Sequence, residues 1–138
     1  MQPPSAAHTM QIVVQPEHID ILNHVNNVVY LGWVQDVAIS HWQEMAPRHM
    51  QESMFWVVRR HEIEYLRSAF LGDTLLVNTW LGREVDGLFE RFTHISRAED
   101  GTALVEVLSL WCPMDMATAR RIRDIPDDVR ELCSITWG

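Results

Sequence analysis

The stretch from Pro16 to Trp33 carries the side chains best suited to chemistry. It reads PEHIDILNHVNNVVYLGW and places a carboxylate, Asp20, four residues before an imidazole, His24. Two asparagines, Asn26 and Asn27, follow just before a long apolar segment, and asparagine is a favoured cap for a helix N-terminus. A helix N-terminus presents unpaired N–H donors and partial positive charge. The sequence therefore predicts an acid or base beside a helix end that can stabilise developing negative charge.

Each of these side chains also has a structural explanation. Asp20 could close a turn, and His24 could orient a water molecule or a substrate carbonyl, or simply bond a carbonyl of its own loop. One asparagine is expected to cap the helix, and Asn26 is favoured as the one that meets Asp20 or a substrate. Asp36, a second carboxylate, lies farther along the apolar segment, where a solvated or interface role would explain it.

The segments on either side of this loop predict a strand and a helix. Residues 10–15 (MQIVVQ) are short, apolar and β-branched, which is typical of a strand. From 28 to 45, apolar residues recur at steps of three and four, which predicts a helix. Its apolar residues cover most of the circumference, so the helix is expected to be largely buried.

The remaining chain predicts four long strands and a short terminal helix. The strands span residues 54–66, 74–85, 88–98 and 102–112, and the helix spans 127–133. Turn signals stand at Gly72–Asp73, Asp86–Gly87 and Asp100–Gly101. Strands joined by short turns are antiparallel, and an antiparallel sheet wrapped around the apolar helix would bury both.

Length and composition favour one domain without nucleic-acid or membrane binding. Residues 1–9 are interpreted as a disordered lead-in and residues 10–138 as a single domain. The net charge of −8 disfavours non-specific binding to nucleic acid or anionic membranes. No apolar run reaches the ~18–20 residues of a membrane span. Two cysteines, Cys112 and Cys133, and no visible secretory signal favour a cytoplasmic location.

Metal and serine-nucleophile chemistry find no support in the sequence. The seven histidines are scattered, and neither C-x-x-C nor H-E-x-x-H occurs. A G-x-S-x-G motif is also missing. We expect no metal site and no serine triad.

Residues 20–30, DILNHVNNVVY, resemble the D-x-x-G-H-V-N-N-x-x-Y signature of hotdog-fold acyl-CoA thioesterases of the 4-hydroxybenzoyl-CoA thioesterase-like family. Weaker matches follow in the family's order, at Ile63–Tyr65, Ser68–Ala69, Gly72–Asp73, Trp111, Asp115, Ala119–Arg120 and Ile125–Pro126. Two positions depart from the pattern. Asn23 stands where the family has glycine, and His18 stands where it often has an acid. Asparagine tolerates positive φ, so the turn is expected to survive.

The resemblance implies an α+β hotdog fold and hydrolysis of an acyl-CoA to a carboxylate and CoA. Asp20 would act as general base or nucleophile, and backbone N–H groups near residues 28–30 would bind the oxyanion. No cofactor is implied, because coenzyme A is part of the substrate. A homodimer or homotetramer with the active site between subunits is expected, since pairing covers the sheet edge.

Coenzyme A needs a basic binding surface for its phosphates. Arg121 and Arg123, beside Arg120, form the one dense basic cluster of this acidic chain, and arginine binds phosphate in a bidentate way. The alternative is a solvated charged face.

An apolar acyl pocket formed by Leu22, Trp33 and Trp56 is also suggested. Two other functions stay open: a module that binds acyl-CoA or acyl carrier protein without turnover, and an acyl-thioester dehydratase using His24 with Asp36.

Overall fold

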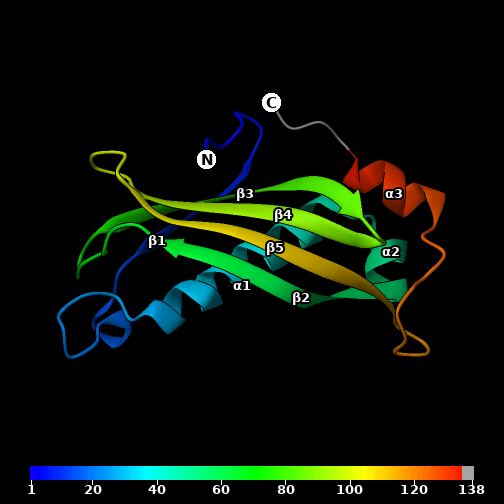
Figure 1. The fold of residues 1–138 in the computed structure, drawn as a ribbon, viewed down its shortest axis with the longest axis horizontal. Coiled ribbons are helices and arrows are strands. Elements are labelled where there is room, and N and C mark those ends of the chain that lie inside the picture. The colour runs from blue at the N-terminus through cyan, green and yellow to red at the C-terminus, as the bar shows by residue number, and fades with distance from the viewer. Residues whose placement is uncertain (135–138) are drawn as a thin grey trace.

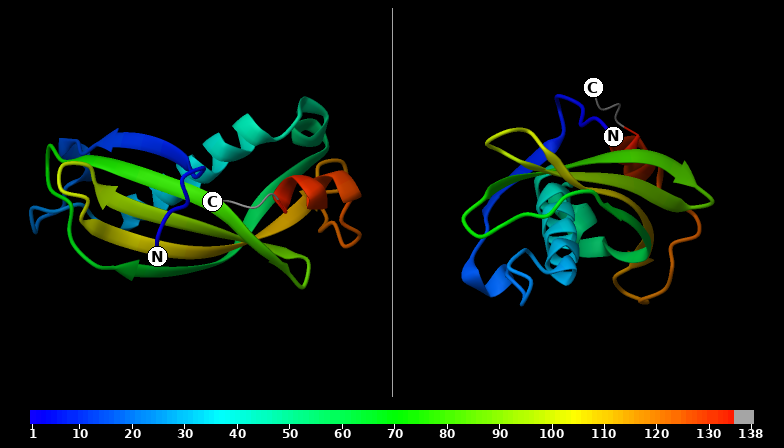
Figure 2. Two further views of the ribbon diagram at one scale, coloured as in Figure 1. Left: turned by 90° about the horizontal axis from the view of Figure 1, so that it is seen from above. Right: turned by 60° about the vertical axis from the view of Figure 1, so that its left-hand side comes forward.

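The computed structural model describes residues 1–134 as one curved antiparallel sheet around a long helix (Figure 1). Five strands lie side by side in the order β1 (His8–Val13), β3 (Thr74–Val85), β4 (Leu88–Arg97), β5 (Ala103–Asp115) and β2 (Met54–Tyr65). The helix α1 (Asn27–Met45) runs along the concave face of the sheet, as the oblique view in Figure 2 shows. The predicted α+β architecture is confirmed.

Most predicted boundaries agree with the structure within a few residues. The strand β1 begins at His8, two residues earlier than predicted, and therefore includes part of the expected lead-in. The predicted terminal helix is α3 (Asp127–Cys133). A second short helix, α2 (Arg48–Ser53), occupies what the sequence indicated as a loop. With six residues and only Met50 buried, α2 is too short to show an apolar period.

The alternation predicted for β2 is interrupted. The register with β5 shifts between Val58 and Arg60, so that Arg59 is an extra residue on the β2 side. Val58 lies opposite Trp111 and His61 opposite Ser109, so the side chains at 58 and 61 share a face. Strict alternation along the predicted strand 54–66 would place residues 57 and 61 on one face, and the bulge, which carries no signal in the polar–apolar pattern, moves them to opposite faces.

The helix α1 buries one face and exposes the other. Its buried residues are Tyr30, Trp33, Val34, Val37, Ala38 and His41. Val28 and Ile39 remain 70% and 53% exposed on the opposite face. The expected burial around most of the circumference is therefore not found within one copy of the chain, because one sheet covers only one side of a helix.

Two apolar clusters fill the space between α1 and the sheet. The larger cluster lies under the N-terminal half of α1 and includes Tyr30, Val34, Leu75, Ile95 and Val107. The second joins α2, α3 and the adjoining ends of the strands, through Met50, Met54, Phe89, Val129 and Cys133. Between them the concave face carries buried polar side chains: Thr79, Arg91, Thr93 and Ser109 from the strands and His41 from α1.

Candidate functional site

The loop between β1 and α1 folds back on itself around Asp20. The Asp20 N–H donates to the carbonyl of His24 at 3.1 Å, and the Asn23 N–H donates to the carbonyl of Asp20 at 3.1 Å. Asn23 has φ of 66°, a conformation that glycine adopts freely and asparagine tolerates. The departure from the family pattern at residue 23 therefore keeps the turn.

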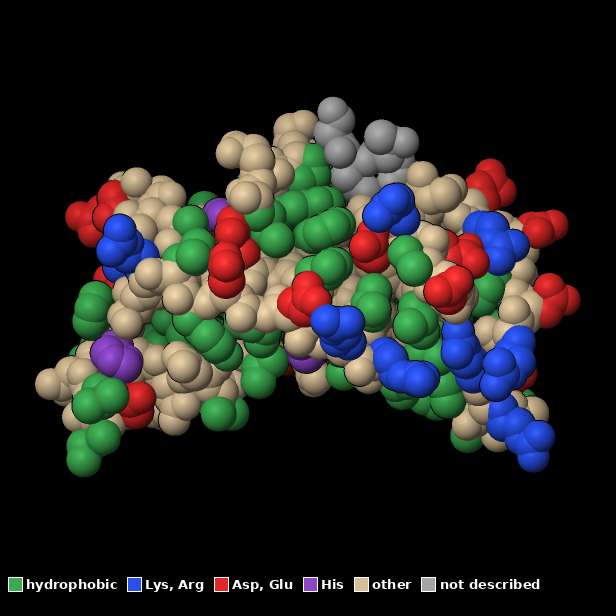
Figure 3. All heavy atoms as spheres, viewed as in Figure 1, with side chains coloured by type: hydrophobic (Ala, Val, Ile, Leu, Met, Phe, Trp, Pro, Cys, Tyr) green, Lys and Arg blue, Asp and Glu red, His purple; other side chains and the backbone are tan. Residues whose placement is uncertain are grey.

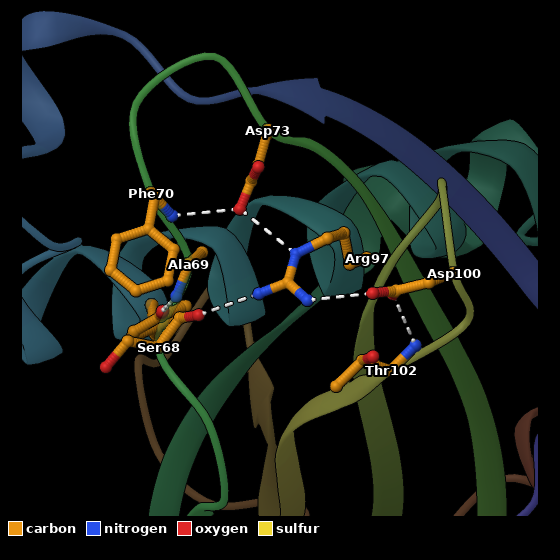
Figure 4. A network of polar contacts seen from close by, with 8 residues as sticks. Ser68, Ala69, Phe70, Asp73, Arg97, Asp100 and Thr102 are labelled. Carbon is orange, nitrogen blue, oxygen red and sulfur yellow. Dashed lines mark hydrogen bonds and ion pairs between the residues drawn. The ribbon is translucent and has the colours of Figure 1, made fainter.

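A neighbouring loop holds this turn in place. The Val25 N–H donates to the carbonyl of Ala69, and the Ala69 N–H donates to the hydroxyl of the buried Tyr30. Asp73 accepts from the Phe70 N–H and pairs with Arg97, whose guanidinium also donates to the carbonyl of Ser68 (Figure 4). The loop 66–73, which carries part of the family resemblance, therefore positions the Asp20 turn.

Asp20 and His24 lie together, but not at hydrogen-bonding distance. The Asp20 Oδ1 accepts from the Leu22 N–H at 2.9 Å and lies 3.8 Å from His24 Nδ1. That His24 nitrogen is buried and has no hydrogen-bond partner within residues 1–134. Catalytic hydrogen bonds are often long before substrate binds. The side chains are about a quarter to a third exposed, so the carboxylate remains open to a substrate.

Asn26 caps the helix, which reverses the predicted roles of the two asparagines. Its Oδ1 accepts from the Val28 N–H at 3.0 Å, and its carbonyl accepts from the Val29 N–H at 2.9 Å. The N–H groups of Val28 and Val29 are therefore occupied. Asn27, the first helical residue, has no acceptor for its N–H within the described chain, as is normal for a helix start.

A hollow of about 120 Å³ lies beside this helix start. Tyr65 on β2 donates its hydroxyl to the carbonyl of Asn27 at 3.2 Å, and both residues line the hollow with Tyr30, Leu66 and Ser68. The edge strand β2 and the start of α1 are thus joined directly. The two apolar residues at the loop tip, Ile21 and Leu22, are 97% and 68% exposed.

Two further residues discussed from the sequence, His18 and Asp36, do not lie against the Asp20 carboxylate in any contact of the described chain. His18 Nδ1 accepts from the Gln15 N–H, and the ring meets Trp33 edge-on at 5.1 Å between centroids; its role is to hold the loop. Asp36 is exposed on α1.

The arginine cluster lies at the opposite end of the sheet from Asp20. Arg121 donates from Nη2 to the carbonyl of Asp86 at 2.8 Å and thereby holds the β3–β4 turn, whereas Arg123 is exposed. Basic side chains gather near this end on the face shown in Figure 3. One copy of the chain therefore does not bring Arg121 and Arg123 together with Asp20.

A larger cavity, of about 310 Å³, lies near the C-terminal end of α1. It is lined mainly by aromatic and aliphatic side chains, among them Trp42, Trp56, Phe89, Trp111 and Met116, together with Arg91. Of the three residues suggested for an acyl pocket, only Trp56 lines it. Leu22 is exposed on the loop, and Trp33 is buried in the larger apolar cluster. No sequence pattern predicts this cavity, because its walls come from segments far apart in the chain.

The described residues hold no group of three His, Cys, Asp or Glu side chains placed to bind a metal ion. Within residues 1–134, no helix combines the length and hydropathy needed to cross a membrane.

Curated relatives of the chain are plant acyl-carrier-protein hydrolases. A chloroplastic acyl-[acyl-carrier-protein] hydrolase from Cuphea viscosissima is 34% identical over 85 residues, which cover 62% of this chain and 20% of that protein. The chloroplastic dodecanoyl-[acyl-carrier-protein] hydrolase from Umbellularia californica is 32% identical over 109 residues, covering 79% and 26%. The chain thus spans about a fifth to a quarter of the length of these relatives.

Solved structures confirm the hotdog fold. A 1,4-dihydroxy-2-naphthoyl-CoA thioesterase from Synechocystis matches with a TM-score of 0.76 at 16% identity, covering 93% of this chain and 96% of that one. A thioesterase from Thermus thermophilus, complexed with coenzyme A and zinc, matches with a TM-score of 0.77 at 22% identity, covering 94% and 98%. The family model described as the Thioesterase-like superfamily matches residues 14–132. The sequence match and the fold agree, and the chain belongs to the thioesterase-like superfamily.

Proposed function

We propose that the chain hydrolyses an acyl-CoA thioester to a free carboxylate and CoA, with Asp20 as the essential acid. The supporting observation is that the Asp20 loop pairs with the residues leading into α1, where the Asn27 N–H has no acceptor in the described chain. A carboxylate and a backbone donor at a helix N-terminus are the two groups that attack on a thioester carbonyl requires.

In the general-base route, Asp20 accepts a proton from a water molecule while the oxygen of that water forms a bond to the thioester carbonyl carbon. The carbonyl oxygen becomes an oxyanion and accepts the Asn27 N–H. Collapse of this intermediate breaks the C–S bond, and the leaving thiolate takes the proton from Asp20. In the nucleophilic route, a carboxylate oxygen of Asp20 attacks the thioester carbonyl carbon, the C–S bond breaks and CoA leaves as a thiolate. Water then hydrolyses the resulting anhydride to the free carboxylate and the Asp20 carboxylate, and the proton released is taken up by the thiolate. His24 is close enough to orient Asp20 in either route.

The active unit in this proposal is a homodimer paired along β2. Two such dimers could associate into a tetramer. β2 is an edge strand of 12 residues, and an exposed edge is a ready site for pairing. The exposed apolar residues Ile21, Leu22, Val28, Ile39 and Val57 would gain cover from a partner. A two-fold axis through β2 would place the Tyr65 end of one strand beside the Met54 end of the other.

This dimer gives the arginine cluster a role in binding coenzyme A. The cluster lies near the start of β2, since the Met116 N–H at the beginning of its loop donates to the carbonyl of Ser53. The two-fold pairing would therefore bring Arg123 of one subunit toward the Asp20 loop of the other. Exposed guanidinium groups there can bind phosphate.

Thiol release from a panel of acyl-CoAs and acyl carrier protein thioesters tests the activity. We expect wild-type protein to release thiol and Asp20→Asn to lose roughly 10²–10⁴ in rate, the usual range for an acid–base group. Full activity in the variant would remove Asp20 from the mechanism. Binding without thiol release would favour a non-catalytic module. Release only from carrier-protein thioesters would replace acyl-CoA by acyl carrier protein as the substrate carrier.

Asn27→Pro tests the proposed oxyanion donor. Proline lacks the N–H but suits the first position of a helix, and Asn26 already has the extended backbone that a following proline requires (φ −61°, ψ 134°). We expect kcat to fall roughly 10²–10³-fold, the usual cost of one oxyanion donor. Asn27→Ala, which keeps the N–H, is the matched control. Equal rates in the two variants would contradict the assignment.

Arg123→Ala tests the coenzyme A surface. We expect KM to rise several-fold with little change in kcat, because the contact would hold a part of the substrate remote from the reaction. Arg83→Ala, which also removes an exposed arginine, is the control. An unchanged KM would leave Arg123 as a solvated charge.

A further inference from the structure

Arg91 is a buried cation on the wall of the large cavity. It lies on β4, is 6% exposed, and forms no ion pair within residues 1–134. Its two hydrogen bonds both use Nη1, which donates to His41 Nδ1 at 2.8 Å and to Thr79 Oγ1 at 3.0 Å. Nε and Nη2 therefore have no acceptor in the described chain.

The neighbours of Arg91 leave its charge uncompensated. Burial lowers the pKa of Arg91 to about 10, so the guanidinium is still positive at neutral pH. Burial and the nearby guanidinium lower the pKa of His41 to about 3, so the imidazole is neutral. Burial raises the pKa of Cys133, another cavity residue, to about 11, so that group is a neutral thiol. Buried charges are normally paired.

A second buried donor on the cavity wall also lacks an acceptor. Trp111, on β5, lines the cavity, and its Nε1 is buried without a hydrogen-bond partner in the described residues. Trp111 lies opposite Phe89 and Ser109 lies opposite Arg91 in the β4–β5 register, so residues 91 and 111 are on one face of the sheet. The cavity thus combines an apolar wall with two unsatisfied donors, one of them charged.

We propose that the cavity binds the far end of an acyl group that has an apolar body and a terminal carboxylate, with the carboxylate held by Arg91. A carboxylate supplies both the missing counter-charge and acceptors for Nε and Nη2 in a bidentate arrangement. The aromatic walls would contact the carbon chain. The delivery of this group as a thioester rests on the proposed function, whereas the carboxylate site does not.

The proposed dimer explains how such a chain would reach the catalytic loop. In one copy, the start of α1 at Asn27 is separated along the helix axis from Ala38, the first cavity-lining residue of α1, by roughly 17 Å at a rise of ~1.5 Å per residue. Met54 and Trp56, at the start of β2, line the cavity. Two-fold pairing of β2 would therefore place this cavity beside the Tyr65 and Asn27 end of the other subunit. The acyl chain would extend from one subunit's loop into its partner's cavity.

Ligand binding can be measured without turnover, because Trp42, Trp56 and Trp111 line the cavity and report through their fluorescence. The probes are monomethyl suberate, which has one carboxylate, and dimethyl suberate, which has the same chain and none. We expect wild-type protein to bind the monomethyl ester at least tenfold more tightly. Arg91→Met should remove that preference, whereas Arg83→Met, at an exposed site, should keep it.

Trp111→Phe provides a milder test of the same wall. It keeps an aromatic ring and removes the Nε1 donor, so the preference for the carboxylate should fall a few-fold. Equal affinity of wild-type protein for the two esters would overturn the proposal, and this comparison requires no variant to fold. Binding of both esters with no response to Arg91→Met would also overturn it.

Turnover separates this inference from the proposed function. Suberoyl-CoA, with a free terminal carboxylate, should exceed octanoyl-CoA in kcat/KM by about tenfold in wild type, and Arg91→Met should reverse the order. Asp20→Asn should slow thiol release from both roughly 10²–10⁴-fold and leave binding of monomethyl suberate unchanged. Ester discrimination without any thiol release would refute only the thioesterase proposal. Thiol release with octanoyl-CoA preferred would refute only the carboxylate site.

Discussion

The two ends of α1 are built by different means. At the N-terminal end, backbone groups of the Asp20 loop bond to one another, to His18 and to the neighbouring loop at Ala69. At the C-terminal end, side chains from α1, α2 and four strands enclose a cavity of about 310 Å³. The first end fixes the position of a carboxylate and a free N–H, and the second provides volume. Under the proposed function, the chemistry would therefore depend on main-chain hydrogen bonds, and ligand contact would depend on side chains.

The largest expected effect tests whether packing holds the C-terminal end. Phe89 is 5% exposed and meets Trp56 edge-on at 5.2 Å. Phe89→Ala should lower the free energy of unfolding by about 3 kcal/mol or more, as is usual for a buried phenylalanine. Phe70→Ala, at a 49% exposed side chain, should change it by less than about 0.5 kcal/mol. Urea denaturation measures both, and similar losses would show that the cavity wall is not a packed core.

The second effect concerns the pH dependence of stability that arises from the neutral imidazole of His41. The pKa of His41 is about 3 in the folded protein and about 6.5 in the unfolded chain, so the unfolded state binds more protons between these values. Stability should therefore fall as the pH falls below 6.5, by roughly 2 kcal/mol at pH 5 for this group alone. Burial lowers the pKa of His61 and His94 as well, with the same sign.

His41→Gln separates this contribution from the others. The variant should show a shallower loss of stability between pH 6.5 and 5, measured by denaturation at each pH. His49→Gln, at an exposed histidine that pairs with Asp128, is the control. If wild type and His41→Gln lost stability equally between pH 6.5 and 5, His41 would have to take up a proton in the folded state as well.

The smallest expected effect on stability belongs to the Asp20 end. Asn26→Ala removes the helix cap and should cost about 1 kcal/mol. It should nevertheless lower kcat clearly, because the cap fixes the first turn that holds the Asn27 N–H. Asn27→Ala should change neither quantity much. If Asn26→Ala destabilised the protein without slowing thiol release, the cap would be purely structural and the contrast between the two ends would weaken.

The sequence predicted the end of the molecule at Asp20 better than the end at the cavity. The Asp20 turn, the helix start and the strand boundaries follow from local signals, namely turn glycines, an asparagine before an apolar run and polar–apolar alternation. The choice between Asn26 and Asn27 as cap was wrong, since both suit the position and one residue of register decides it. From the sequence, Arg91 is one residue of an alternating strand that could contribute to coenzyme A binding across an interface. Its role in the cavity comes from the absence of a counter-charge among its neighbours within residues 1–134, and those neighbours are set by tertiary structure.

The row of buried polar residues between the two apolar clusters affects how the protein can diverge in evolution. Thr79, Arg91, Ser109 and His41 form a boundary across which few apolar side chains interlock. Substitutions at distant sites without shared contacts usually have additive effects. Changes in the cavity wall can therefore accumulate without disturbing the Asp20 turn. Under the two proposals made above, a gene duplicate could acquire a new acyl preference by a few substitutions near Arg91 and keep the same reaction at Asp20.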